Sequence, residues 1–165
     1  GLKFEPIHRV LFNVDVDDVL NKAVTYYEDK GSKVLCVESD SPEQADPAIK
    51  ADNAHIIPFI SSKKAGKLIV CDPKYTLEVG TLQTFLDELL KDNSTAKIDY
   101  IHGKDVVTDL GSKTGNMGFY LPSMDKHDLF KTVILEGALP RKTFSMGEAE
   151  EKRFYLECRK IRPGI

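Results

Sequence analysis

Hydrophobic and polar positions follow two different periods along the chain, and together they predict strands mixed with helices. Alternating or continuously apolar runs predict strands at 8–14, 33–38, 55–60, 67–71, 97–102, 117–121 and 153–161. Helical spacing predicts helices at 16–29, 80–90, 105–110 and 125–137, with one acidic helical turn at 148–151. We therefore expect an α/β (α+β) fold, in which four or five helices cover a mixed sheet of about six or seven strands.

The clearest helical stripe lies in the middle of the chain. Leucine and phenylalanine follow the spacing i, i+3, i+4, i+7, i+8 at Leu82, Phe85, Leu86, Leu89 and Leu90. This stripe predicts one buried helical face against the sheet. Residues 39–53 contrast with it, because they hold two prolines, several acids and few large apolar groups. They predict a long exposed loop with at most one helical turn near 45–51.

Composition and charge bound the class of protein. The 165 residues are 41% hydrophobic and 30% charged, which is typical of a globular chain, and we expect residues 1–165 to form a single domain without an internal boundary. A net charge of −3 and the absence of a long apolar run lead us to expect neither nucleic acid nor a membrane as a partner. Three cysteines without a CxxC pair argue against a disulfide framework and for a cytoplasmic location. We expect Cys36 and Cys71, which lie in apolar strands, to be reduced and poorly reactive.

Local motifs for catalysis or cofactor binding are absent from the sequence. Neither GxxxxGK[ST] nor GxGxxG occurs, and the GSKTG segment at 111–115 follows a helix end, which favours a solvent turn over a phosphate loop. The four histidines lie far apart without ligand spacing: His8, His55, His102 and His127. We therefore assign no metal, no cofactor and no catalytic residue.

The C-terminal tail offers the best candidate site. Residues 140–165 hold seven Lys/Arg and four Asp/Glu, a local charge of +3 in an acidic chain. Arginine forks, lysines and a short helix start would suit a small anionic ligand such as a phosphate or a carboxylate. The predicted anion-binding residues are Arg141, Lys142, Ser145, Lys152 and Arg153. Alternatively, these cations pair with Glu148, Glu150 and Glu151 on a solvated surface.

Three segments resemble a known family. They are PRKTFSMGEAEEKRFYLECRKI at the tail, PIHRVLF at 6–12 and DYIHG at 99–103. They resemble the C-terminal half of a bacterial and archaeal family called domain of unknown function ten-fifteen, and the likeness covers essentially the whole chain. Members of that family have an additional N-terminal half with an Asp-Gly-(His/Asn)-His-type motif similar to the ParB/sulfiredoxin superfamily. The motif is absent here, so the resemblance implies that this chain is the C-terminal half of a longer protein and that the missing N-terminal half is its partner.

Three functional hypotheses follow from these observations. The leading one is an accessory C-terminal half that completes a ligand cleft with the missing N-terminal half. The second is part of a nucleotide-dependent phosphotransferase that acts on a small metabolite, similar to the free-serine kinases of the related superfamily. The third is a ligand-binding or self-association module, such as a homodimer, without chemistry of its own. Whether the protein is an enzyme stays open at this point.

Overall fold

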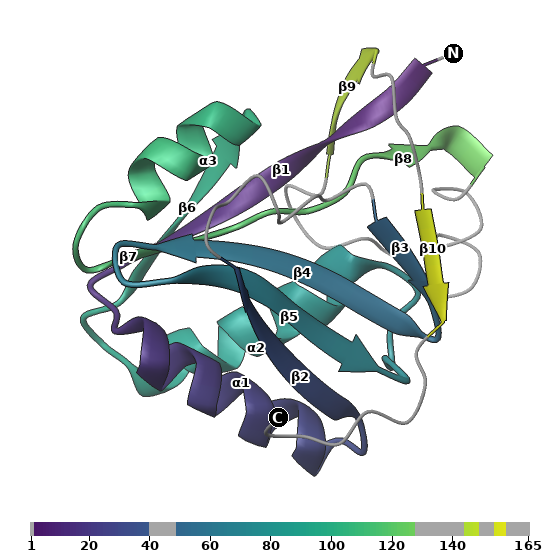
Figure 1. Cartoon of the computed structure of the whole chain (residues 1–165). Coiled ribbons are helices and arrows are strands. Elements are labelled where there is room, and N and C mark those ends of the chain that lie inside the picture. The colour runs from purple at the N-terminus through teal and green to yellow at the C-terminus, as the bar shows by residue number, and fades with distance from the viewer. Residues whose placement is uncertain (1, 40–48, 128–143, 149–153, 158–165) are drawn as a thin grey trace.

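The computed structural model describes residues 2–39, 49–127, 144–148 and 154–157 (Figure 1). The helices are α1 (Val16–Asp29), α2 (Glu78–Asp92) and α3 (Lys104–Gly111); the strands are β1 (Leu2–Phe12), β2 (Lys33–Ser39), β3 (Ile49–Asp52), β4 (Ala54–Ser61), β5 (Ala65–Cys71), β6 (Lys97–His102), β7 (Asn116–Phe119), β8 (Met124–Asp125), β9 (Phe144–Glu148) and β10 (Phe154–Glu157). This is the predicted α+β class, with three helices in the described residues against the four or five expected. The predicted helix at 125–137 lies mostly outside those residues. Of the predicted turn at 148–151, the one described residue, Glu148, ends β9 instead.

The sheet is mixed, as predicted. Its main part runs in the order β2-β5-β4-β7-β1-β6, and each pair of neighbours is antiparallel. Strand β3 pairs antiparallel with the start of β4, and β10 pairs with β3 in parallel. Strand β1 pairs with β6 and β7 over its second half and with β8 and β9 over its first half.

The loop predicted at 39–53 is partly wrong. Residues Ile49–Asp52 form β3, and this strand pairs along its whole length with Phe154–Glu157. Strand pairing uses backbone N–H and C=O groups, so it does not require an apolar side-chain pattern. The partner strand comes from the other end of the chain, so no local pattern could reveal the pairing.

The two faces of the sheet are covered by different helices. Val10 and Leu11 are neighbours on β1 and point to opposite faces. Leu11 belongs to a core cluster with the buried residues of α1 and α2, whereas Val10 packs in a second cluster with Val107 of α3. Helices α1 and α2 therefore lie on one face and α3 on the other. No helix of the described residues is both long and apolar enough to cross a membrane.

The sequence determines α1 through its ends and its apolar stripe, and α2 through its apolar stripe. The Asp15 carboxylate accepts a hydrogen bond from the backbone N–H of Asp18 at 3.1 Å, and Gly31 adopts φ +85° just after the helix. The predicted stripe of α2 is confirmed, because Leu82, Phe85, Leu86 and Leu89 are buried and Leu90 is partly buried. These stripes seat both helices on the sheet with their polar sides outward.

Candidate functional site

Most of the predicted anion site lies outside the described residues. Arg141, Lys142, Lys152 and Arg153 all fall there. Ser145 lies in β9, where it pairs with Glu5 of β1. The structure therefore places one member of the predicted site beside the first strand, and the site as a whole stays a prediction.

Strand β1 carries two buried polar residues that the sequence analysis missed. His8 is 3% exposed and lies on the α3 face. Its Nδ1 accepts a hydrogen bond from the backbone N–H of Leu121 at 2.9 Å, and its ring packs edge-on against Tyr120 with 5.8 Å between centroids. Burial, together with the positive charge of Arg9, lowers the pKa of His8 to about 4. At neutral pH this ring is therefore uncharged and serves as a hydrogen-bond acceptor.

Arg9, the next residue, points to the opposite face and has no exposed surface. Its Nε donates to Oε1 of Gln83 on α2 at 2.9 Å, and the Gln83 amide donates in turn to Asp87 at 2.8 Å. The guanidinium also donates to the carbonyl of Ile7 and lies 4.9 Å from the ring centre of Tyr100. Burial lowers the pKa of Arg9 to about 10, so the group stays charged at neutral pH.

The buried side chains of His8 and Arg9 connect β1 to other elements of the fold. The tyrosine beside His8 is tied to α3, because its hydroxyl lies 2.6 Å from Oγ1 of Thr108. Arg9 fastens β1 to α2 through Gln83. Their signal in the sequence was the pair HR inside an apolar strand, since buried histidine and arginine need dedicated partners. Neither side chain reaches the surface in this arrangement, so their observed contacts hold elements of the fold together.

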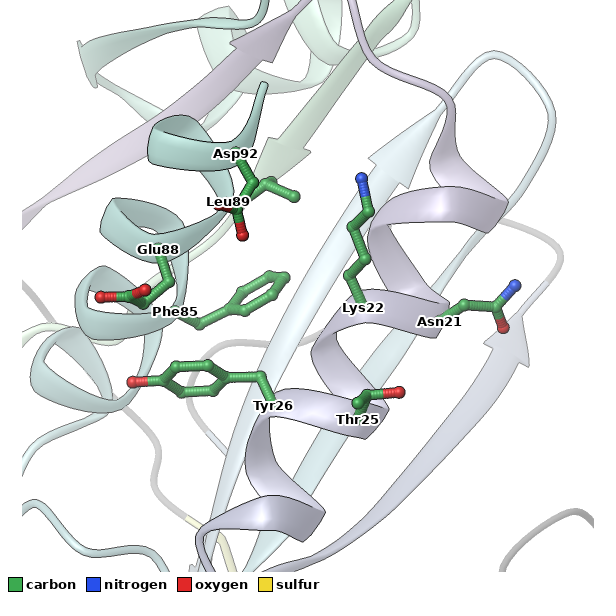
Figure 2. A pocket seen from close by; sticks show the side chains of 8 residues that line it. All are labelled: Asn21, Lys22, Thr25, Tyr26, Phe85, Glu88, Leu89 and Asp92. Atoms are coloured by element: carbon green, nitrogen blue, oxygen red, sulfur yellow. The ribbon is translucent and has the colours of Figure 1, made fainter. Parts of the chain in front are cut away.

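A groove of about 330 Å³ lies between α1 and α2 (Figure 2). Tyr26 points from α1 toward α2, and Phe85 and Leu89 point from α2 toward α1, so these three form an apolar floor. The Tyr26 and Phe85 rings are in contact, with 5.5 Å between their centroids. The remaining lining residues are polar: Asn21, Lys22, Thr25, Glu88 and Asp92. The volume falls at the lower end of the range for ligand pockets.

The charges on this groove are mostly negative. Lys22 pairs with Asp18 at 3.0 Å, and Glu88 pairs with Lys91 at 3.2 Å. Such exposed pairs are worth little, so they leave the rim free to rearrange around a partner. Asp92 adds a further carboxylate to the lining. The lining thus holds two carboxylates, Glu88 and Asp92, and one ammonium group, Lys22, an excess of one negative charge that favours a cationic group over a phosphate.

The remaining candidates for chemistry are metal-ligating clusters and the cysteines. Within the described residues, no group of three or more His, Cys, Asp or Glu could hold a metal ion. Cys36 is a free thiol, and its pKa is raised by burial and by nearby Glu38. The prediction of a reduced Cys71 is wrong, because this residue is disulfide-bonded. Alternation placed Cys71 correctly in an apolar strand but could not reveal a neighbour distant in sequence.

Comparisons with known proteins show the fold. No family model matches the chain, and no curated protein matches it. The structure is similar to a mutant free serine kinase in complex with AMP, with a TM-score of 0.56 and 14% identity over 88% of this chain and 54% of that one. It is also similar to a conserved hypothetical protein from Pyrococcus furiosus, with a TM-score of 0.54 and 14% identity over 94% of this chain and 59% of that one.

The chain thus spans little more than half the length of each of these two proteins. At this level of identity the likeness establishes a shared fold. One of the two proteins that share it is itself uncharacterised. The specific family suggested by the tail and the missing N-terminal half both stay predictions.

Proposed function

We propose that this chain is the accessory part of a nucleotide-dependent phosphotransferase that acts on a small metabolite. The observation that carries the proposal is the fold shared with a free serine kinase over 88% of this chain. The same match covers 54% of the kinase, which leaves room for a companion part that completes the ligand cleft. Since one fold hosts many functions, the proposal also needs a site, and the charge distribution suggests where it lies.

In this proposal residues 140–165 bind the anionic substrate groups, and the rest of the fold supports them. Residues 140–165 carry a local charge of +3, and there Arg141 and Lys142 would hold anionic oxygens as charge develops in phosphoryl transfer. Strand β9 carries Ser145 next to β1. Arg9 of β1 donates to Gln83 of α2, and His8 of β1 accepts from the backbone N–H of Leu121, which follows β7. This scaffold would give the tail a rigid base, and the companion part would supply the remaining reacting groups.

Nucleotide binding tests the proposal directly. AMP, ATP and inorganic phosphate are titrated into the protein, and binding is followed by calorimetry and by thermal unfolding. A ligand at one hundred times its Kd should stabilise the protein by about 2.7 kcal/mol. Raising the salt concentration should weaken the effect, because exposed charges are screened within about 10 Å at 0.1 M ionic strength. Free serine, added with ATP, then tests for phosphoserine by mass spectrometry.

Two variants give the assay its control. Arg141→Ala should abolish the nucleotide effect, because a lysine cannot reproduce the bidentate fork of arginine. Lys113→Ala removes an exposed cation from the turn after α3 and should leave binding unchanged. Binding that survives Arg141→Ala, or the absence of any response to all three ligands, would refute this proposal.

A further inference from the structure

The groove between α1 and α2 is a feature of the described surface that the proposed function does not use. Its floor is apolar, since Phe85 and Leu89 are 2% and 3% exposed and lie beneath the partly buried ring of Tyr26. It opens away from the sheet, on the side where the polar residues of both helices point (Figure 2). An apolar floor between two parallel walls of polar side chains is the form of surface that receives an amphipathic helix.

The two helices that form the groove are strongly acidic. Helix α1 holds four acidic residues and one lysine, and α2 likewise holds four acidic residues and one lysine. Each helix therefore has a formal charge of −3, and the pair has −6 where the whole chain has −3. Lysines pair with three of these acids, Asp17, Asp18 and Glu88, which reduces the excess of negative charge but does not reverse its sign. The remaining negative charge favours a basic partner.

The charge distinguishes between candidate occupants. A nucleotide or phosphate is disfavoured, because Glu88 and Asp92 stand on the rim. A second copy of this chain, docked through the same face, would bring two surfaces of −6 together and place like charges opposite each other. An amphipathic helix with a basic polar face satisfies both the apolar floor and the acidic rim.

We propose that the α1–α2 groove docks a basic amphipathic helix of a partner protein as the third helix of a three-helix layer. Helices of 14 and 15 residues are each about 21 Å long, so they offer a track for about four turns of partner helix. Apolar anchors at i, i+3, i+4 and i+7 of the partner would contact Tyr26, Phe85 and Leu89. Its lysines and arginines would face Glu88 and Asp92.

Binding of a designed amphipathic peptide tests whether the α1–α2 groove can dock a basic helix. The probe is a 14-residue amphipathic peptide with leucine at the anchor positions and lysine elsewhere. One control peptide has the same composition in scrambled order, and another has glutamate in place of lysine. Binding is measured by calorimetry, helix formation by circular dichroism, and the contact surface by amide chemical-shift changes. We expect the amphipathic probe alone to bind, with the largest shifts at residues 21–26 and 85–92.

Charge reversal on the rim makes the test specific. Glu88→Lys combined with Asp92→Lys should weaken binding about tenfold or more, because two exposed attractions become repulsions. The matched control is Asp105→Lys with Asp109→Lys on α3, which changes the net charge equally on the opposite face of the sheet and should leave affinity within about twofold. All four positions are exposed, so both proteins should fold, and circular dichroism checks this. No binding, equal binding by the scrambled or acidic peptide, or equal losses in both variants would overturn the proposal.

Discussion

Replacing the buried histidine of β1 should change how folding stability depends on pH. His8 has a folded-state pKa of about 4, whereas a histidine in an unfolded chain titrates near 6.5. Between these values the unfolded chain binds a proton that the folded protein does not, so the free energy of unfolding falls as the pH falls. The contribution of His8 is complete above pH 6.5 and is lost progressively toward pH 4. The linkage relation gives a loss of about 2.5 kcal/mol between pH 7.5 and 4.5.

The structure suggests a substitution that isolates this effect. His8→Asn removes the titration, and its side-chain oxygen takes the place of Nδ1 as the acceptor for the N–H of Leu121. The asparagine lacks the ring contact with Tyr120, so the variant should be less stable at pH 7.5. Its stability should nevertheless decline less than that of the wild type as the pH falls. The two proteins should therefore converge toward pH 4.5.

Urea unfolding at half-unit steps from pH 7.5 to 4.5 measures the difference. The chain has no tryptophan, so circular dichroism of the helices is the suitable signal. His127→Asn removes an exposed imidazole that is not among the groups lowering the pKa of His8, and it serves as the control, since His8 remains and the wild-type decline should persist. Parallel curves for wild type and His8→Asn would refute the assignment of His8 as a neutral buried acceptor.

Four further predictions concern stability and reactivity. Leu86→Ala should lower the free energy of unfolding by about 2–5 kcal/mol, because the side chain is fully buried in the core; an unchanged urea midpoint would mean that the phase of α2 is wrong. Arg9→Met should cost about 1–3 kcal/mol by leaving Oε1 of Gln83 buried without its donor, and adding Gln83→Leu should recover part of that loss in a double-mutant cycle. Gly111→Ala should cost about 1–3 kcal/mol in urea unfolding, since a Cβ there would lie 2.7 Å from a methyl of Ile60 and 2.9 Å from the backbone N of Gly118. Cys36 should react with a thiol reagent more slowly at pH 7 than free glutathione does, because burial raises its pKa, and rapid labelling would contradict this.

Local patterns predicted the elements better than the relations between them. Helix α1 has the predicted bounds of 16–29, because an Asp cap, an apolar stripe and a Gly end all lie within one segment. Helix α2 begins two residues before the predicted start at 80, since Glu78 and Val79 continue the helix ahead of the apolar stripe. Strand β3 was missed because it depends on β10, which lies far along the chain. The pattern of apolar residues thus predicts which side of a segment is buried, but it does not predict which distant strand the segment pairs with.

The candidate surfaces show the same division. Phe85 and Leu89 were predicted to be buried, yet the groove they share with Tyr26 arises only because α1 and α2 are neighbours in space. The solvent turn predicted at 111–115 agrees with the structure at 112–115, where residues 112–114 are exposed and Gly115 has φ +82°, whereas Gly111 is buried and ends α3. The disulfide of Cys71 could not be foreseen from an odd cysteine count. The missed groove and the missed disulfide each involve parts of the chain that lie far apart in the sequence.

The divided pairing of β1 has a consequence for how this protein emerges during synthesis. About 140 residues separate residues 2–6 from their partner strand β9, so at typical translation rates β9 is made on the order of ten seconds after them. Throughout that interval they form a strand edge with open backbone groups, which is a template for aggregation. The segment carries Lys3, Glu5 and Pro6, and charged side chains and proline are the residues that keep a waiting edge from pairing with another chain. These residues of the first strand thus reduce the risk of pairing with another chain before β9 is available.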